Sequence, residues 1–226
     1  MSAGIKFYSS TGSLMIDSAY SNIALLQKVH IKAANRSGVI TTNNTFNITT
    51  SVKEPIIVFP IDEVPYGVYS IIRKSDGNGF DIVAACRGNN DLKMFIFGKP
   101  EDVTTNGPAL RIYSDIDGSK VFDSRLKYLK VIGEVVKGTP IPSSKNWGWL
   151  MRERQLEQQV VMTNPGSNPS GYHLLFLNSW YKYENKIEKN FVHVHGQYYS
   201  SLNQVPYYVM DPIRGIDPLL IDLGNF

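Results

Sequence analysis

Short runs of β-branched and aromatic residues, separated by turn-forming residues, follow one another through the first 136 residues. The runs read IKFY, SLMI, FNITTSV, PIIVFP, YGVYSIIR, FDIVAAC, KMFIFG, LRIY, KVF and LKVIGEVV. Runs of this length and composition form strands, and the Gly, Asn, Asp and Ser residues between them form turns. Hydrophobic residues make up 42% of the chain and charged residues 19%, which is enough apolar material for a packed core. We therefore predict an all-β fold, an antiparallel β-sandwich.

The clearest turn in this pattern is Asp76-Gly77-Asn78-Gly79, which lies between two strand-like runs. A tight turn needs positive φ angles, which Gly and Asn adopt at little cost. This stretch predicts a β-hairpin.

One hairpin pattern occurs twice in the chain. Residues 5–18 read IKFYSSTGSLMIDS and residues 110–124 read LRIYSDIDGSKVFDS. Each copy has a strand that ends in Tyr, a turn with Gly, a second strand and a final Asp-Ser. Asp and Ser at a strand end accept hydrogen bonds from backbone N–H groups one or two residues on, so a structural role is expected for Asp17-Ser18 and Asp123-Ser124. The repeat predicts two related hairpins.

A change of composition divides the chain near residue 138. Residues 137–148, KGTPIPSSKNWG, are rich in Pro, Gly and Ser, which is typical of a linker or a long loop. We therefore expect a β-sandwich domain with the repeated hairpin over residues 1–138. A smaller β-rich region is expected over residues 139–226.

The second region contains the best helix candidate, residues 149–161, because this stretch is rich in Leu, Arg, Glu and Gln. Its apolar spacing is poor, so a strand fits it equally well. Residues 172–183 and 191–199 predict two further strands. The tail, residues 211–226, is apolar and broken by Pro, which predicts an extended arm that lies on something else.

Charge and composition narrow the possible partners. The net charge is +3 and the basic residues are scattered, so the basic stripe of a nucleic-acid binder is missing. No apolar run approaches the length of about 20 residues that spans a bilayer. The N-terminus lacks a basic stretch followed by an apolar one, and we expect a soluble protein made in a cytoplasm.

Cys86, the only cysteine, lies in an apolar run, and we expect its side chain to be buried.

Two closely spaced histidines form the sequence pattern that most specifically suggests a metal site. His193 and His195 stand two residues apart in FVHVHGQYY, so on a regular strand they share one face, about 7 Å apart. Three symmetry-related copies would supply six imidazole nitrogens to one transition metal. Two half-exposed strand histidines are the alternative, and we expect no cofactor unless the protein is trimeric.

Carboxylates and hydroxyls form no catalytic motif. Asp115, Asp117, Asp211 and Asp217 come in pairs, but the ligand spacing of an EF-hand loop is missing, and turn formation explains them better. Neither a Gly-x-Ser-x-Gly elbow nor a phosphate-binding loop occurs. We expect a protein that is not an enzyme.

Aromatic residues crowd the last third of the chain. Among them, Trp180, Tyr183, Tyr198 and Tyr207 are candidate contacts for a protein partner or a glycan, because aromatic rings bring a large contact area at little entropic cost. Filling the core of a small second region is an equal alternative.

The second copy of the hairpin sequence and its continuation, ALRIYSDIDGSKVFDSRLKYLKVIGEV, resemble a sequence motif found in minor tail and other virion-associated proteins of tailed bacteriophages. The shared features are a strand ending in Tyr-x-x-x-Gly, an apolar strand, Phe-Asp-Ser with a basic residue, and a further apolar strand. The resemblance implies a β-rich structural component of the phage tail, and it implies no catalytic residues. Some phage fibres and spikes hold iron with His-x-His pairs, so it also favours the metal hypothesis for His193 and His195.

We therefore expect a virion protein that is made in the host cytoplasm and works by assembly with other tail proteins. It would present sheet edges, loops and the C-terminal arm to its neighbours in an oligomer or a larger assembly. The first alternative is a tail protein that binds a receptor or a host-surface glycan. The second is a wall or capsule hydrolase, which would need converging carboxylates in a cleft.

Overall fold

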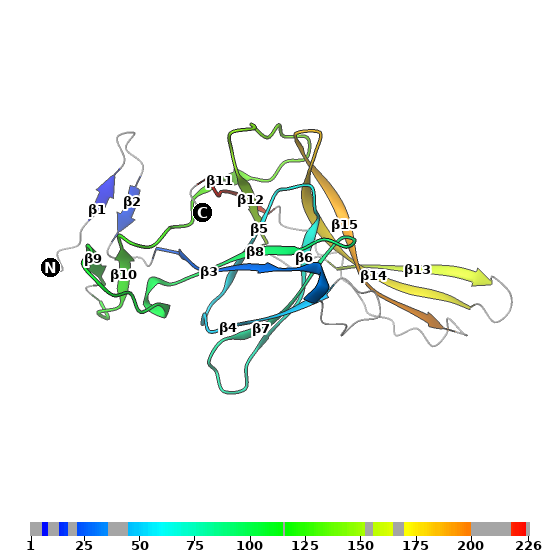
Figure 1. Cartoon of the computed structure of the whole chain (residues 1–226), viewed down its shortest axis with the longest axis horizontal. Coiled ribbons are helices and arrows are strands. Elements are labelled where there is room, and N and C mark those ends of the chain that lie inside the picture. The colour runs from blue at the N-terminus through cyan, green and yellow to red at the C-terminus, as the bar shows by residue number, and fades with distance from the viewer. Residues whose placement is uncertain are drawn as a thin grey trace.

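The computed structural model confirms an all-β chain with antiparallel pairing (Figure 1). It describes residues 6–8, 14–17, 22–35, 45–114, 116–151, 156–164, 170–199 and 218–224. Two short 3-10 helices, η1 (Ala33–Asn35) and η2 (Pro100–Asp102), interrupt the strands. None of the helices in these ranges is long and apolar enough to cross a bilayer.

The largest sheet has six strands in the order β11-β16-β12-β5-β8-β3. Its strands are β3 (Ala24–Ile31), β5 (Ile56–Pro60), β8 (Leu92–Gly98), β11 (Val131–Glu134), β12 (Trp147–Leu150) and β16 (Leu219–Asp222). β12 and β16 follow residue 138 in the sequence, yet they lie between β11 and β5. The boundary expected near residue 138 therefore does not separate two sheets.

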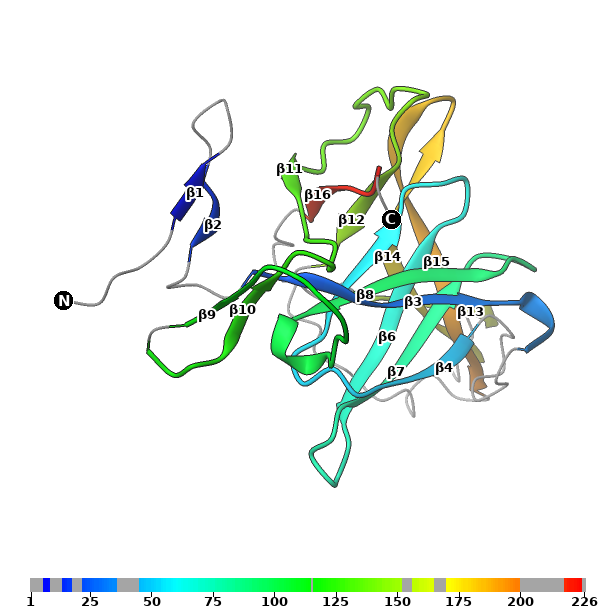
Figure 2. The same ribbon diagram turned by 60° about the vertical axis from the view of Figure 1, so that its left-hand side comes forward.

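A smaller sheet stacks on the six-stranded one and forms the main core with it (Figure 2). It has the order β4-β7-β6, with β4 (Thr45–Thr50), β6 (Tyr66–Arg73) and β7 (Phe80–Cys86). Phe59 of β5 stacks on Tyr66 of β6 at a ring-centroid distance of 5.7 Å, and it also contacts Trp149 of β12 at 5.2 Å. Cys86 is buried in this core, as its apolar sequence context predicts.

A third sheet covers the outer face of β6 and β7. It contains β13 (Leu156–Asn164), β14 (Ser170–Tyr183) and β15 (Lys186–Tyr199). Alternate positions of β6 face opposite ways: Tyr66 points into the main core, while a Cβ on Gly67 would lie 3.0 Å from the Leu177 side chain of β14. The backbone N–H of Tyr66 also donates to the Ser179 hydroxyl at 2.8 Å. Glycine at position 67 therefore allows β14 to approach closely.

The prediction of a helix over residues 149–161 is wrong, and the alternative prediction of a strand is confirmed in the described parts of this stretch. β12 ends at Leu150 and β13 begins at Leu156, so both described parts of the stretch are extended. The pairing of β12 with β5 and β16 supplies hydrogen bonds that an isolated helical preference does not outweigh.

The hairpin predicted at residues 76–79 joins β6 to β7. Gly77 and Gly79 have φ angles of 73° and 111°, and the Asp76 carboxylate accepts a hydrogen bond from the Asn78 N–H at 2.8 Å. A second tight turn, Glu184-Asn185, joins β14 to β15 with φ angles of 47° and 60°. This second turn has no glycine, so it could not be predicted from the sequence in the same way.

Candidate functional site

The two copies of the repeated sequence form two hairpins with the same register. In the first, β1 (Lys6–Tyr8) pairs with β2 (Leu14–Asp17), and Lys6 lies opposite Asp17. In the second, β9 (Arg111–Tyr113) pairs with β10 (Lys120–Asp123), and Arg111 lies opposite Asp123. Each second strand has one extra residue at the same place, Met15 or Val121, where the register shifts. The repeated hairpin predicted from the sequence is confirmed.

The Asp123 carboxylate lies at the base of the second hairpin and is fully buried. Arg125 binds both of its oxygens, with Nε 2.9 Å from Oδ1 and Nη2 2.6 Å from Oδ2. The Thr105 hydroxyl donates to Oδ2 at 2.5 Å. Arg111 Nε and Lys120 Nζ lie 3.4 and 3.8 Å from the same oxygen. The hydrogen bond from Arg125 holds the pKa of Asp123 far below its usual range, against the opposing effect of burial.

The same two arginines also fasten the hairpin to the preceding loop. Arg111 Nη2 donates to the carbonyls of Thr105 and Gly107, each at 3.1 Å. Arg125 donates to the carbonyls of Thr105 at 3.2 Å and Gly107 at 3.0 Å, and also to that of Asn106. Because a guanidinium group carries five donors in one plane, two arginines can satisfy one carboxylate and several carbonyls together. We call this set of contacts the Asp123 clamp.

Tyr128 completes the clamp from the other side. Its hydroxyl accepts the Asp123 backbone N–H at 2.5 Å and donates to the Asp123 carbonyl at 3.0 Å. Its ring stacks on Phe122 with centroids 4.9 Å apart, and burial raises the pKa of its hydroxyl. The base of the hairpin is therefore fixed through both backbone and side chains.

The structural role expected for the Asp-Ser ending is confirmed in the second copy. Asp123 Oδ1 accepts the Arg125 backbone N–H at 3.1 Å, and Ser124 Oγ accepts the Leu110 N–H at 3.2 Å. The turn role expected for Asp117 is confirmed as well, because its carboxylate accepts the Ser119 N–H at 3.0 Å and hydroxyl at 2.8 Å. Asp115, Asp211 and Asp217 lie outside the described residues.

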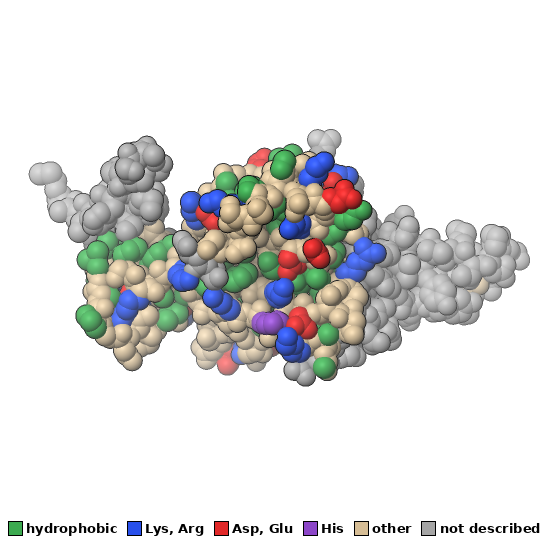
Figure 3. All heavy atoms as spheres, turned by 45° about the horizontal axis from the view of Figure 1, so that its top comes forward, with side chains coloured by type: hydrophobic (Ala, Val, Ile, Leu, Met, Phe, Trp, Pro, Cys, Tyr) green, Lys and Arg blue, Asp and Glu red, His purple; other side chains and the backbone are tan. Residues whose placement is uncertain are grey.

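Large apolar side chains on this hairpin are exposed. Leu110 is 56% exposed, Tyr113 53% and Ile116, at the turn, 80%. Hydrophobic side chains gather on the lobe that carries β9 and β10, at one end of the molecule (left in Figure 3). A base that is held by the Asp123 clamp, with exposed apolar side chains from Leu110 at the base to Ile116 at the turn, suits docking onto another protein surface.

Most of the partners of Asp123 could not be predicted from the sequence. The basic residue after Phe-Asp-Ser was visible as part of the motif, and Arg125 fills that position. The roles of Thr105 and Arg111 carry no local sequence signal, because their contacts depend on how the loop at 103–107 folds onto the hairpin.

The proposed metal ligands His193 and His195 both lie in β15. The register shifts between them: position 193 pairs with Phe176 and position 195 with Leu175, so the simple alternation of a regular strand is interrupted there. Their side chains lie outside the described set. Among the residues whose side chains are described, no group of three or more His, Cys, Asp or Glu residues is placed to hold a metal ion.

The aromatic candidates occupy different environments. Trp180 is only 9% exposed and belongs to the main core, so the expected contact surface does not include it. Tyr183 is 55% exposed near the end of β14, and its ring lies 6.4 Å from that of Tyr181. The Tyr198 side chain and the whole of Tyr207 lie outside the described residues.

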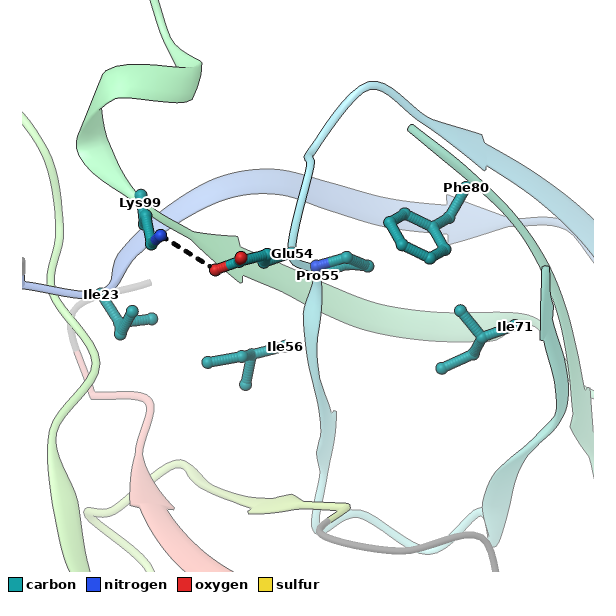
Figure 4. Close-up of a pocket in the computed structure, with 7 residues that line it drawn as sticks. All are labelled: Ile23, Glu54, Pro55, Ile56, Ile71, Phe80 and Lys99. Carbon is teal, nitrogen blue, oxygen red and sulfur yellow. Dashed lines mark ion pairs between the residues drawn. The ribbon is translucent and has the colours of Figure 1, made fainter. Parts of the chain in front are cut away.

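An apolar groove opens between the ends of the sheets, as two adjoining hollows of about 360 and 400 Å³ that share Pro55, Ile56 and Ile71. Figure 4 shows the first, which is also lined by Ile23, Phe80 and the Lys99–Glu54 ion pair. The pair has a length of 3.0 Å, and its hydrogen bond raises the pKa of Lys99. The groove can accept apolar groups, with one ion pair at its rim.

Comparisons with known proteins identify no relative: no family model, no curated protein and no solved structure matches this chain.

Proposed function

We propose that this chain is a structural virion protein of a tailed bacteriophage, a minor tail component that works by assembly with neighbouring subunits. The observation that carries the proposal is the β9–β10 hairpin, which combines a clamped base with the exposed apolar side chains of Leu110, Tyr113 and Ile116. The resemblance to phage tail proteins rests on residues 109–135, which include this hairpin. The motif and the candidate docking surface are therefore one element.

The clamp favours docking for an energetic reason. A flexible hairpin would lose conformational entropy on binding, which reduces affinity. The Asp123 clamp and the stacked Phe122–Tyr128 pair fix the hairpin before any partner arrives. The apolar groups of Leu110, Tyr113 and Ile116 then supply the buried anchors from which most binding energy comes.

The proposal is tested in the phage that encodes the chain. Ile116→Asp places a charge at the most exposed apolar position of the hairpin, and we expect the particles to lose this protein. Ile72→Asp is the matched control, because Ile72 is 61% exposed on β6, far from the hairpin in the sequence and on a different sheet. Normal amounts of the Ile116→Asp chain in purified particles would contradict the proposal.

Receptor or glycan binding is the second candidate, favoured by the exposed Tyr183 ring and its contact with Tyr181. Adjacent aromatic rings suit stacking on sugar rings. Tyr183→Ala would then abolish attachment to host cells while the particles keep this protein at normal levels. Normal attachment by that variant would exclude the tyrosine pair as the receptor contact.

A further inference from the structure

Strand β4 forms one edge of the smaller stacked sheet, whose order is β4-β7-β6 (Figure 2). Its six residues, Thr45–Thr50, lie opposite residues 80–85 of β7 in an unbroken antiparallel register. Phe46 and Ile48 belong to the main core, while Asn47 is exposed on the other face of the strand. The strand is therefore fixed against the core and against β7.

The hydrogen bonds at the two ends of the β6–β7 pair show which backbone groups of β7 face β6. The Lys74 N–H donates to the Gly79 carbonyl at 3.0 Å, and the Arg87 N–H donates to the Pro65 carbonyl at 3.1 Å. Backbone groups of successive residues in an antiparallel strand point to alternate sides. The odd-numbered residues of β7 therefore bond to β6, and the even-numbered ones bond to β4.

The register of β4 then decides which of its own backbone groups are left over. Phe46, Ile48 and Thr50 lie opposite the even-numbered residues of β7 and bond to them. The N–H and C=O groups of Asn47 and Thr49 point to the opposite side, away from β7. Within the described ranges, no group is hydrogen-bonded to these outward N–H and C=O groups. Two alternate residues of β4 thus present unused donors and acceptors along the edge.

The other edges of the two stacked sheets carry features that hinder the addition of a strand. β3, β6 and β11 each have a shift of register in their pairing, and β3 also carries the exposed Lys28 and His30. β4 has no such shift, and no charged residue occurs between Ser37 and Val52. Proteins protect open edges with bulges, charges and prolines. An edge that lacks all three is suited to being covered by another strand.

We infer that the β4 edge binds an extended segment of a neighbouring protein in the particle, which joins the smaller sheet beside β4. Donors and acceptors at alternate residues match the spacing of another extended backbone. Residues that lie opposite each other in a sheet share a face. The added segment therefore alternates in type, with apolar side chains beside Phe46 and Ile48 and polar side chains beside Asn47 and Thr49.

The small size of this contact favours another protein over a second copy of the chain. A symmetric pair of six-residue β4 strands would bury much less surface than the roughly 1,200–2,000 Å² of a stable interface. A partner that the β9–β10 hairpin already holds can use the β4 edge as a second contact, because the second binding event is then intramolecular. The inference rests in this way on the proposed function.

Hydrogen exchange of the wild-type protein, free and in purified particles, tests the inference without any substitution. In the free chain, the amides of Phe46, Ile48 and Thr50 should exchange slowly because they bond to β7. Those of Asn47 and Thr49 should exchange fast. In particles, the amides of Asn47 and Thr49 should slow by at least about tenfold, since the added strand accepts their hydrogen bonds.

Each other result of this experiment has a definite meaning. Slow exchange of Asn47 and Thr49 in the dilute free chain would show that the edge is already covered, and it would overturn the inference. Slowing that depends on the concentration of the free chain would make a second copy the occupant and would also overturn it. If the chain is present in particles and the exchange of both residues is unchanged, only the inference fails. If particles lack the chain, the proposed function fails as well.

Thr49→Pro and Thr49→Val form a matched pair of variants. Both lose the hydroxyl group that donates to Asp81 at 2.8 Å, but only Thr49→Pro loses the outward N–H, and neither loses a backbone bond to β7. Each variant is produced together with the wild-type chain during phage infection. The share of Thr49→Pro in particles should fall about fivefold below its share in the lysate, through the loss of one hydrogen bond. Thr49→Val should keep its share. Equal incorporation of both variants, folded as wild type, would overturn the inference.

Discussion

Arg125 binds both carboxylate oxygens of Asp123, at 2.9 and 2.6 Å, and Asp123 has no exposed surface. A buried carboxylate is costly unless it is paired and hydrogen-bonded, and removing its partner leaves the charge uncompensated. Arg125 makes the shortest of the charged contacts to this carboxylate, beside those of Arg111 and Lys120, so we expect the order of the hairpin to depend on this clamp at its base.

Asp123→Asn tests this dependence with almost no change of shape. The amide cannot form the charged bidentate contact with Arg125, so the hairpin should open more often. Charged hydrogen bonds contribute enough that backbone amides of residues 111–123 should exchange about tenfold to a hundredfold faster. Amides of β7 and β8 serve as the internal control in the same hydrogen-exchange experiment and should keep their rates. Unchanged exchange in the hairpin would show that the clamp is not needed.

Acid should destabilise the fold through several carboxylates. Hydrogen bonds lower the pKa of Asp123, mainly from Arg125, that of Asp91, mainly from Lys32, and that of Asp222, mainly from the Gly224 N–H. A carboxyl group whose pKa is lowered on folding adds stability above its unfolded pKa of about 3.9, and this stability is lost as the pH falls toward the folded value. The free energy of unfolding, measured with urea, should therefore be lower at pH 3 than at pH 7. Equal stability at both pH values would contradict this prediction.

The β6–β7 turn offers two glycines for a matched comparison. A Cβ on Gly79 would lie 1.9 Å from the Thr50 carbonyl oxygen, whereas a Cβ on Gly77 would meet nothing within 4 Å. Both residues have positive φ angles, so Gly77→Ala should cost about 1–2 kcal/mol of unfolding free energy from backbone strain alone. Gly79→Ala should cost clearly more, because β4 must move. Equal losses in urea unfolding would disprove the close approach of β4 to the turn.

Trp180 and Tyr183 should respond differently to the same substitution. Trp180→Ala empties space in the main core and should lower the free energy of unfolding by about 3–5 kcal/mol. Tyr183 is exposed, so Tyr183→Ala should change stability by no more than about 0.5 kcal/mol. Thermal or urea unfolding measures both. A small effect at Trp180 would contradict its place in the core.

The parts of this fold that follow from local pattern could be predicted from the sequence. The strand runs, the turn at Gly77 and Gly79, the repeated hairpin and the turn role of Asp117 all depend on neighbours in the chain. Strand pairing across the chain could not be predicted, because β12 joins β5 from a distance of about ninety residues and local composition does not encode such partners. The same reason explains why residues 149–161 suggested a helix.

The same distinction between local and long-range contacts applies to the candidate site. The Asp-Ser ending and the basic residue after it form a local sequence motif, so a structural role of Asp123 could be predicted. Its contacts with Thr105 and Arg111 form only when the preceding loop packs against the hairpin. For Trp180 the sequence left a contact surface and the core as equal alternatives, because composition does not tell which face of a strand is covered.

The central claim is the proposal that this chain is a phage virion protein that docks through its β9–β10 hairpin. Its most direct test is the number of copies of this chain in purified phage particles. Quantitative mass spectrometry would compare wild type, Ile116→Asp and Ile72→Asp, after both variants are shown to unfold at the wild-type temperature. We predict that the Ile116→Asp chain is lost from the particles while the Ile72→Asp chain is retained. Equal copy numbers for all three would contradict the claim.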